Sequence, residues 1–94
     1  MKVQLDYLFE ITEERENQVK KWGIQNHTPI EWLAILMEEV GEVSREALEY
    51  HFHKFYQDTG QLERYEKELI QVAAVALAML ESLSRNELNK KGSK

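Results

Sequence analysis

The chain contains no cysteine, a single proline and only four glycines among its 94 residues. Without cysteine, a disulfide framework and a thiolate zinc site are both excluded. The scarcity of proline and glycine, in a chain rich in leucine, glutamate and alanine, favours an all-α protein. This length predicts one domain over residues 1–94, with a small core that assembly with further copies would extend.

Long apolar runs and a positive charge balance are also missing. No stretch reaches the ~20 apolar residues of a membrane span, and the N-terminus lacks the apolar centre of a signal peptide. The formal net charge is −5, which argues against a general nucleic-acid-binding protein but is compatible with a nucleotide that arrives with a metal ion. We therefore expect a cytoplasmic protein with neither a membrane nor a nucleic acid as its partner.

The first helix is predicted over residues 3–21, where Gly23 provides a stop signal. Its apolar stripe is imperfect and consists of Leu5, Leu8, Ile11, Val19 and Trp22. Its other face is crowded with acidic side chains that we place toward solvent, namely Glu10, Glu13, Glu14 and Glu16.

The start of the second helix is the most clearly marked feature of the chain. Thr28 is a good N-cap, Pro29 suits the first helical position, and Glu31 completes a capping box. The helix is predicted to continue to about residue 50 or 54. Its apolar face is expected to comprise Leu33, Leu36, Val40, Val43 and Ala47.

The third helix is predicted from about residue 62 to 83, after a capping box formed by Asp58 and Gln61. Between residues 69 and 80 every side chain except Gln71 is apolar, so this helix must be covered on all sides. Because two other helices cannot cover it completely, we expect a partner chain on the remaining face. Residues 86–94 are predicted to form a frayed basic tail.

Acidic side chains recur on the second helix at the spacing of neighbours on one helical face: Glu39, Glu42, Glu46 and Glu49. Glu39 and Glu42 adjoin its most apolar part, and the third helix adds Glu68 and Gln71 at the same i, i+3 spacing. A partly buried carboxylate pair needs a proton, a cationic partner or a metal ion. Two helices with such pairs can hold a hard cation between them. The alternatives are a solvated acidic face and, for Gln71, a hydrogen bond between helices.

Three motifs resemble those of the MazG-like all-α nucleotide pyrophosphohydrolases, a superfamily that includes dimeric dUTPases, dCTP pyrophosphatases and phosphoribosyl-ATP pyrophosphohydrolase. They are Trp22-Gly-x-Gln-x-His27-x-Pro, then Glu38-Glu-Val-Gly-Glu42, then Glu68-Leu-Ile-Gln71 before an apolar run. The resemblance covers residues 22–83. It implies an oligomeric helical bundle, a homodimer or homotetramer, that cleaves a nucleoside triphosphate between its α and β phosphates.

The resemblance also implies a site for Mg²⁺, or Mn²⁺ as a substitute, formed by Glu39, Glu42, Glu68 and position 71. Glu39 or Glu38 would act on the attacking water as the catalytic carboxylate. Position 71 departs from the family pattern, because Gln71 stands where the family has aspartate. One full charge at ~4 Å contributes about 4 kcal/mol at an effective dielectric constant of about 20, before desolvation, so this exchange threatens the chemistry more than the fold.

Three further residues are candidates for contact with the nucleotide: Trp22, His27 and Trp32. For the tryptophans the alternative is core or interface packing, and for His27 it is stabilisation of its own loop. The candidates for contact with the phosphates are the basic residues Lys54, Arg64, Arg85, Lys90 and Lys91. His51 and His53 point apart at i and i+2 on a helix, so we interpret them as solvated or packed on aromatic rings.

Two other functions remain open from the sequence. One is a catalytically weak or inactive helical module that binds nucleotides or drives oligomerisation, which Gln71 favours. The other is a structural acidic bundle with no ligand. Gly41, between the key glutamates, either admits a close neighbour or is a tolerated glycine, with a cost of about 1 kcal/mol relative to alanine.

Overall fold

The computed structural model describes residues 1–52 and 60–88, and over these ranges the chain folds into helices without strands. The elements are α1 (Gln4–Trp22), α2 (Pro29–Phe52), α3 (Gln61–Leu83) and a π-helical turn, η2 (Ser84–Leu88). The all-α class and the three main helices expected from the sequence are confirmed. Residues 86–88, which we placed in the terminal tail, instead continue α3 as part of η2.

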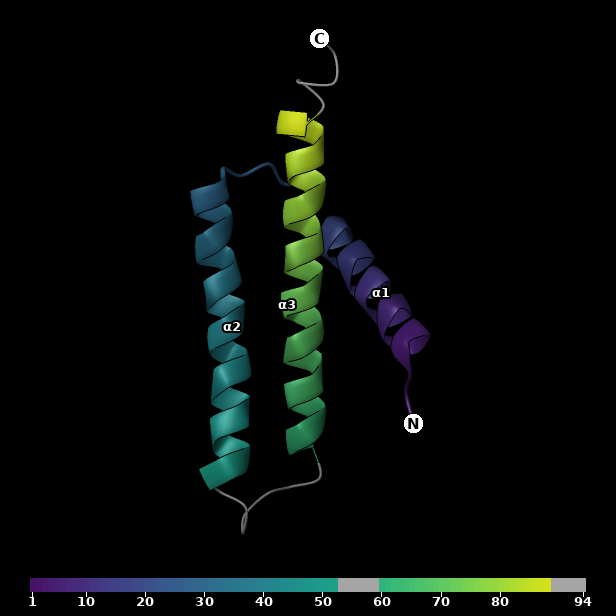
Figure 1. Ribbon diagram of the computed structural model, residues 1–94, viewed down its shortest axis with the longest axis vertical. Coiled ribbons are helices and arrows are strands. Elements are labelled where there is room, and N and C mark those ends of the chain that lie inside the picture. Colours follow the sequence, from purple (N-terminus) through teal and green to yellow (C-terminus); the bar gives the residue numbers. More distant parts are fainter. Residues whose placement is uncertain (53–59, 89–94) are drawn as a thin grey trace.

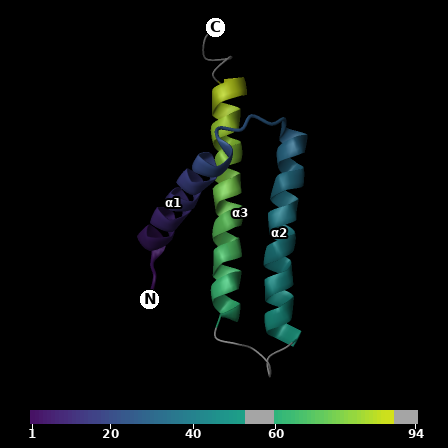
Figure 2. The same ribbon diagram turned by 180° about the vertical axis from the view of Figure 1, so that it is seen from behind.

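The central element is α3, which packs against α2 on one side and against α1 on another. Figure 1 shows α2 and α3 side by side over most of their length, with α1 inclined to them. Figure 2, from behind, shows the same order. Within the described residues α1 makes its helix contacts with α3 and not with α2, so the bundle is open rather than closed.

The end of α1 follows from Gly23. This residue has a φ of 74°, in the left-handed region that a side chain disfavours, and its N–H donates to the carbonyl of Val19 at 2.7 Å. Lys20 and Lys21 in the last turn complement the negative end of the helix dipole. The predicted stop is therefore confirmed.

The predicted capping box at the start of α2 is also confirmed. The backbone N–H of Thr28 donates to Glu31 Oε1 at 2.8 Å, and the Glu31 N–H donates back to Thr28 Oγ1 at 3.3 Å. These bonds lower the pKa of Glu31. The second capping box lies partly outside the described residues, because Asp58 is not among them; α3 begins at Gln61, after Gly60.

The apolar core lies between α2 and α3 around the buried Trp32, Val75 and Ala78. Three partly buried residues pack around them: Ile35, Leu36 and Met79. The predicted apolar face of α2 is wrong at its two ends, because Leu33 and Ala47 are exposed. On α2, Trp32 and the acidic residues Glu39, Glu42 and Glu46 contact α3, whereas Leu33 is exposed.

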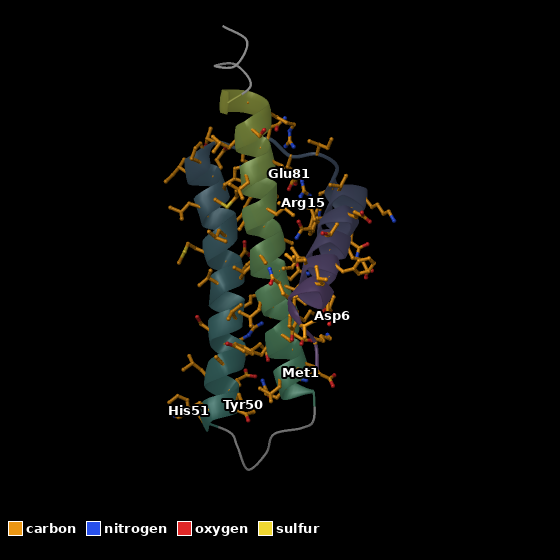
Figure 3. All side chains as sticks on the ribbon, turned by 45° about the vertical axis from the view of Figure 1, so that its right-hand side comes forward. Met1, Asp6, Arg15, Tyr50, His51 and Glu81 are labelled. Atoms are coloured by element: carbon orange, nitrogen blue, oxygen red, sulfur yellow. The ribbon has the colours of Figure 1, made fainter. Side chains whose placement is uncertain are left out.

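Polar side chains link α1 to α3. Gln18 is the buried residue of α1, and Ile11 and Val19 of the predicted stripe are half-buried, whereas Leu5, Leu8 and Trp22 are exposed, so the stripe is wrong at these three positions. Instead, the Tyr7 hydroxyl donates to Glu66 Oε2 at 2.9 Å, and Arg15 pairs with Glu81. Figure 3 shows Arg15 and Glu81 close together across the two helices.

Several large apolar side chains remain exposed along α2 and α3. They are Ile30, Leu33, Met37 and Leu48 on α2, and Leu62, Leu69, Leu80 and Leu83 on α3. Among the described residues only four apolar side chains are buried, a small core for a chain of 94 residues. No helix in the described ranges combines the length and apolarity needed to cross a membrane.

Candidate functional site

Three carboxylates meet on facing turns of α2 and α3. One oxygen from each of Glu39, Glu42 and Glu68 lies within 4.8 Å of the other two, and all three side chains are half-buried. Glu39 and Glu42 are brought to one face of α2 by their i, i+3 spacing, and the antiparallel packing of α3 places Glu68 opposite them. The structure therefore brings together three of the four residues predicted as metal ligands.

The surroundings of these carboxylates disfavour their charged forms. Burial raises the pKa of Glu39, and the charges of Glu42, Glu38 and Glu14 raise it further. Burial is also the largest cause of the raised pKa of Glu68, followed by the charge of Glu42. A proton or a cation that neutralises such a carboxylate cluster therefore stabilises it.

Gln71 is held by α1. Its Nε2 donates to Glu14 Oε2 at 2.7 Å, and its Oε1 accepts a hydrogen bond from Gln18 Nε2 at 3.3 Å. This is the hydrogen bond between helices that we weighed against a ligand role for Gln71. Glu14, which we had placed on a solvent-facing surface, is half-buried in this contact, so that placement is wrong.

The other acidic residues of α2 differ in their surroundings. Glu38 is exposed, and its negative charge helps to raise the pKa of Glu39. Glu46 is 8 % exposed, accepts a hydrogen bond from Gln61 Nε2 at 2.8 Å and lies 3.5 Å from Arg64 Nε. Arg64, a candidate for phosphate binding, is therefore paired with Glu46 within the fold.

A cavity of about 420 Å³ lies beside the start of α2. Its walls include His27, Trp32 and the end of α3, and the two rings meet edge to face with centroids 4.8 Å apart. Trp32 is 5 % exposed, and neither its Nε1 nor His27 Nε2 has a hydrogen-bond partner among the described residues. A buried N–H without a partner is costly, so these atoms can gain from a ligand with polar edges.

This cavity lies near the three carboxylates along the helix. Trp32 precedes Glu39 by about two turns of α2, which corresponds to about 10 Å along the axis. Asn26 also lines the cavity, and its Oδ1 accepts hydrogen bonds from Arg85 at 3.0 Å and Asn86 at 3.1 Å. Arg85, another candidate for phosphate binding, therefore also has a hydrogen-bond partner within the fold.

The remaining predicted residues lie elsewhere. Trp22 is 55 % exposed at the end of α1, where Lys21 Nζ lies 4.7 Å from its ring centroid, and it is not among the residues that line the cavity. His51 is exposed and packs edge to face on Phe52, as expected for a solvated or aromatic-packed histidine. Four candidates fall outside the described residues: His53, Lys54, Lys90 and Lys91.

Sequence reasoning missed the polar residues of α1 that contact Gln71. Glu14 and Gln18 lie on the same face of α1 as Ile11, at the spacing i, i+3, i+7. That spacing was the signal available in the sequence. It was hard to recognise, because the neighbouring Glu13 and Glu16 are exposed and made the whole acidic stretch look like a solvent-facing surface.

The donor set of the three carboxylates fits a hard divalent cation. Mg²⁺ prefers oxygen ligands, accepts one or two carboxylates and retains several waters. Three half-buried carboxylates supply such oxygens, together with negative charge that the site itself does not balance.

Comparisons with protein-family models, with curated proteins and with solved structures find no match for this chain.

Proposed function

We propose that this chain is a Mg²⁺-dependent nucleotide pyrophosphohydrolase, which cleaves a nucleoside or deoxynucleoside triphosphate to the monophosphate and pyrophosphate. The observation that carries the proposal is the convergence of Glu39, Glu42 and Glu68 from two helices within 4.8 Å. The resemblance of the sequence motifs to MazG-like enzymes gives this cluster its chemical interpretation.

In this proposal Glu39, Glu42 and Glu68 hold the cation. When bound, the cation would neutralise phosphate oxygens and so make phosphorus accessible to a nucleophile. Glu38 is exposed beside them and would orient a water or accept its proton. The base would enter the cavity lined by His27 and Trp32, whose buried ring nitrogens lack a hydrogen-bond partner among the described residues.

The decisive measurement is pyrophosphate release from a panel of canonical and modified NTPs and dNTPs, with Mg²⁺ or Mn²⁺. Glu42→Gln should abolish release and remove cation binding in calorimetry. Glu49→Gln is the matched control, since it makes the same change at an exposed position of α2. Release by Glu42→Gln at the wild-type rate would contradict the proposal, as would a wild type that is inactive on every substrate.

A second candidate is a helical module that binds nucleotides without cleaving them. The hydrogen bonds of Gln71 favour it, because they direct this side chain to α1. In the family that the sequence resembles, the same position carries an acidic metal ligand. A thermal shift with nucleotide but no pyrophosphate release would support this reading.

We also propose that the chain self-associates, as a homodimer or a homotetramer. The exposed apolar rows of α2 and α3, including Met37 and Leu80, support this proposal. Burial of these rows against a second copy would extend a core that is small within one chain.

A further inference from the structure

The contact between α2 and α3 repeats along both helices, which run antiparallel (Figure 1). Three pairs mark it, each pair seven positions from the last on both helices: Trp32 with Val75, Glu39 with Glu68, and Glu46 with Gln61. Seven residues make nearly two helical turns, so this interval is typical of helices that pack lengthwise against each other.

The residue that follows each of these contacts is apolar and is not buried. These six residues, which we call the heptad seam, are Leu33, Val40 and Ala47 on α2, and Leu62, Leu69 and Ala76 on α3. Leu62 is 52 % exposed and Leu69 43 %, whereas Val40 and Ala76 are half-buried. The seam therefore forms an open apolar surface beside the contact of the two helices.

Both halves of the seam lie on the same side of the helix pair. One residue turns an α-helix by ~100°. Because α2 and α3 are antiparallel, the same turn along each chain carries both apolar rows to one side of the pair. The seam thus consists of three levels, each with one residue from either helix: Leu33 with Ala76, Val40 with Leu69, and Ala47 with Leu62.

Helix α1 borders the seam without covering it. Tyr7 and Ile11 of α1 line a cavity of about 470 Å³ together with Leu62 and Leu69, and both leucines stay exposed. Within the described part of the chain α1 packs on α3 and not on α2, so it does not extend across the pair.

The pattern of the seam indicates which partner fits it. An apolar repeat of seven residues is typical of packing against other helices, and the six side chains carry no charge that a partner must balance. Each level combines a larger side chain with a smaller one. A two-fold axis parallel to the helices lays α2 of one copy over α3 of another, so that Leu33 meets Ala76 and Leu62 meets Ala47. The seam is thus complementary to itself, as an isologous interface requires.

The size of this face also fits a second copy. Helix α2 has 24 residues and α3 has 23. At 1.5 Å per residue and about 10 Å per helix, the pair presents a face of ~700 Å², close to the ~800 Å² that each partner contributes to a stable interface. A single helix would cover about half of this face, whereas a second copy brings two helices side by side.

We propose that the heptad seam packs against the heptad seam of a second copy, and that the two antiparallel pairs form a four-helix bundle. This inference rests on the proposed self-association and names the surface through which it occurs. It does not depend on a metal ion or on a nucleotide.

The first test is analytical ultracentrifugation of Leu69→Glu. This variant should weaken self-association at least ~100-fold, because each copy then buries a charge without a partner. Leu48→Glu is the matched control, since Leu48 is 55 % exposed and follows Glu46 by two positions, which turns it ~200° from the contact with α3. Its self-association should equal that of the wild type. Circular dichroism checks that both variants remain helical.

The absence of cysteine allows a second test that adds no charged side chain. Ala47→Cys places a thiol in the seam, whereas Leu48→Cys places one on the far side of α2, and both positions are exposed in one chain. When the protein concentration is raised until about nine-tenths of the chains are associated, Ala47→Cys should react with a soluble aromatic disulfide ~10-fold more slowly, because only dissociated chains react. The rate for Leu48→Cys should not change.

The outcomes separate this inference from the proposals on which it rests. A wild type that associates while Ala47→Cys stays as reactive as Leu48→Cys overturns the seam as the interface and leaves self-association standing. Equal dissociation of Leu69→Glu and Leu48→Glu also overturns it, because it indicates a general effect of added charge. A wild type that is monomeric at micromolar concentration overturns both, and leaves the seam to a helical partner of another kind. Pyrophosphate release tests the enzymatic proposal independently of these results.

Discussion

At the scale of residues, buried polar side chains carry much of the specificity of this fold. Glu46 and Gln61 are each 8 % exposed, and they satisfy one another across α2 and α3. Gln18 and Gln71 do the same across α1 and α3. Each pair couples two helices, because removal of one partner leaves the other buried without its hydrogen bond.

Gln61→Ala tests the first of these pairs. We expect the free energy of unfolding to fall by about 1–2 kcal/mol, because the Glu46 carboxylate loses a buried donor. Urea denaturation measures this change. Glu63→Ala, at an exposed position of the same turn, is the control and should change stability little. A loss of the same size in both variants would count against the buried pair.

The pH dependence of stability follows from the raised pKa values of Glu39 and Glu68. The folded state holds these protons more tightly than the unfolded chain, so their contribution is present below the usual pKa of 4.5 and is lost as pH rises through the raised values. In EDTA, the thermal midpoint should therefore fall as pH rises from about 4.5 toward neutrality.

In two other carboxyl groups the pKa is shifted in the opposite direction. The pKa values of Glu31 and Glu66 are lowered by their hydrogen bonds, so their stabilisation is lost at pH values below 4.5. Glu68→Gln provides the control for the upper range, because it removes one of the two raised groups and should flatten the fall above pH 4.5. An unchanged slope in this variant would contradict the assignment.

At the scale of elements, the helix ends are fixed by local hydrogen bonds. Thr28 and Glu31 form two reciprocal hydrogen bonds at the start of α2, and Gly23 ends α1 with a positive φ of 74°. These features lie within a few residues of each other in the chain. They hold whatever the helices pack against.

Gly23→Ala should destabilise the chain by about 1–2 kcal/mol, because a Cβ is strained at a φ of 74°. The cost is conformational rather than steric, since no atom lies within 4 Å of the added Cβ. Gly23→Asn should cost about as much as Gly23→Ala, because a φ of 74° with a ψ of −174° is a conformation that essentially only glycine adopts, and not the left-handed helical one that asparagine tolerates. A much smaller loss for Gly23→Asn, measured by chemical denaturation, would contradict this cause.

At the scale of the whole molecule, the open arrangement of the helices leaves apolar surface uncovered. Helix α3 contacts α1 and α2, yet Leu69 and Leu80 are still exposed. Gly41 on α2 has open space around it, because a Cβ added there would meet no described atom within 4 Å beyond its chain neighbours and the adjacent backbone of its own helix. The close approach that we considered for Gly41 is therefore not made within one chain.

We expect sedimentation to show a dimer or a larger species at micromolar concentration. Leu80→Glu should shift the chain toward a monomer, since it places a charge on the exposed apolar row of α3. Lys67→Glu, at an exposed polar position of α3, is the control and should not. A monomeric wild type would contradict self-association.

The sequence alone determined the helical class, the three main helices and their ends, because capping and periodicity depend on residues close together in the chain. It also predicted that Glu39 and Glu42, one helical turn apart, would share a face of α2 and meet Glu68 of α3. The resemblance, the function and the cation remain predictions that the experiments above address.

Only the tertiary structure decided which face of each helix is turned inward. On α2, Trp32 and Glu46 are buried whereas Leu33 is exposed. The polar contact of α1 with α3 brings Glu14 to Gln71, 57 positions away in sequence. Neither result follows from periodicity, because each depends on how the shape and polarity of one helix match those of another.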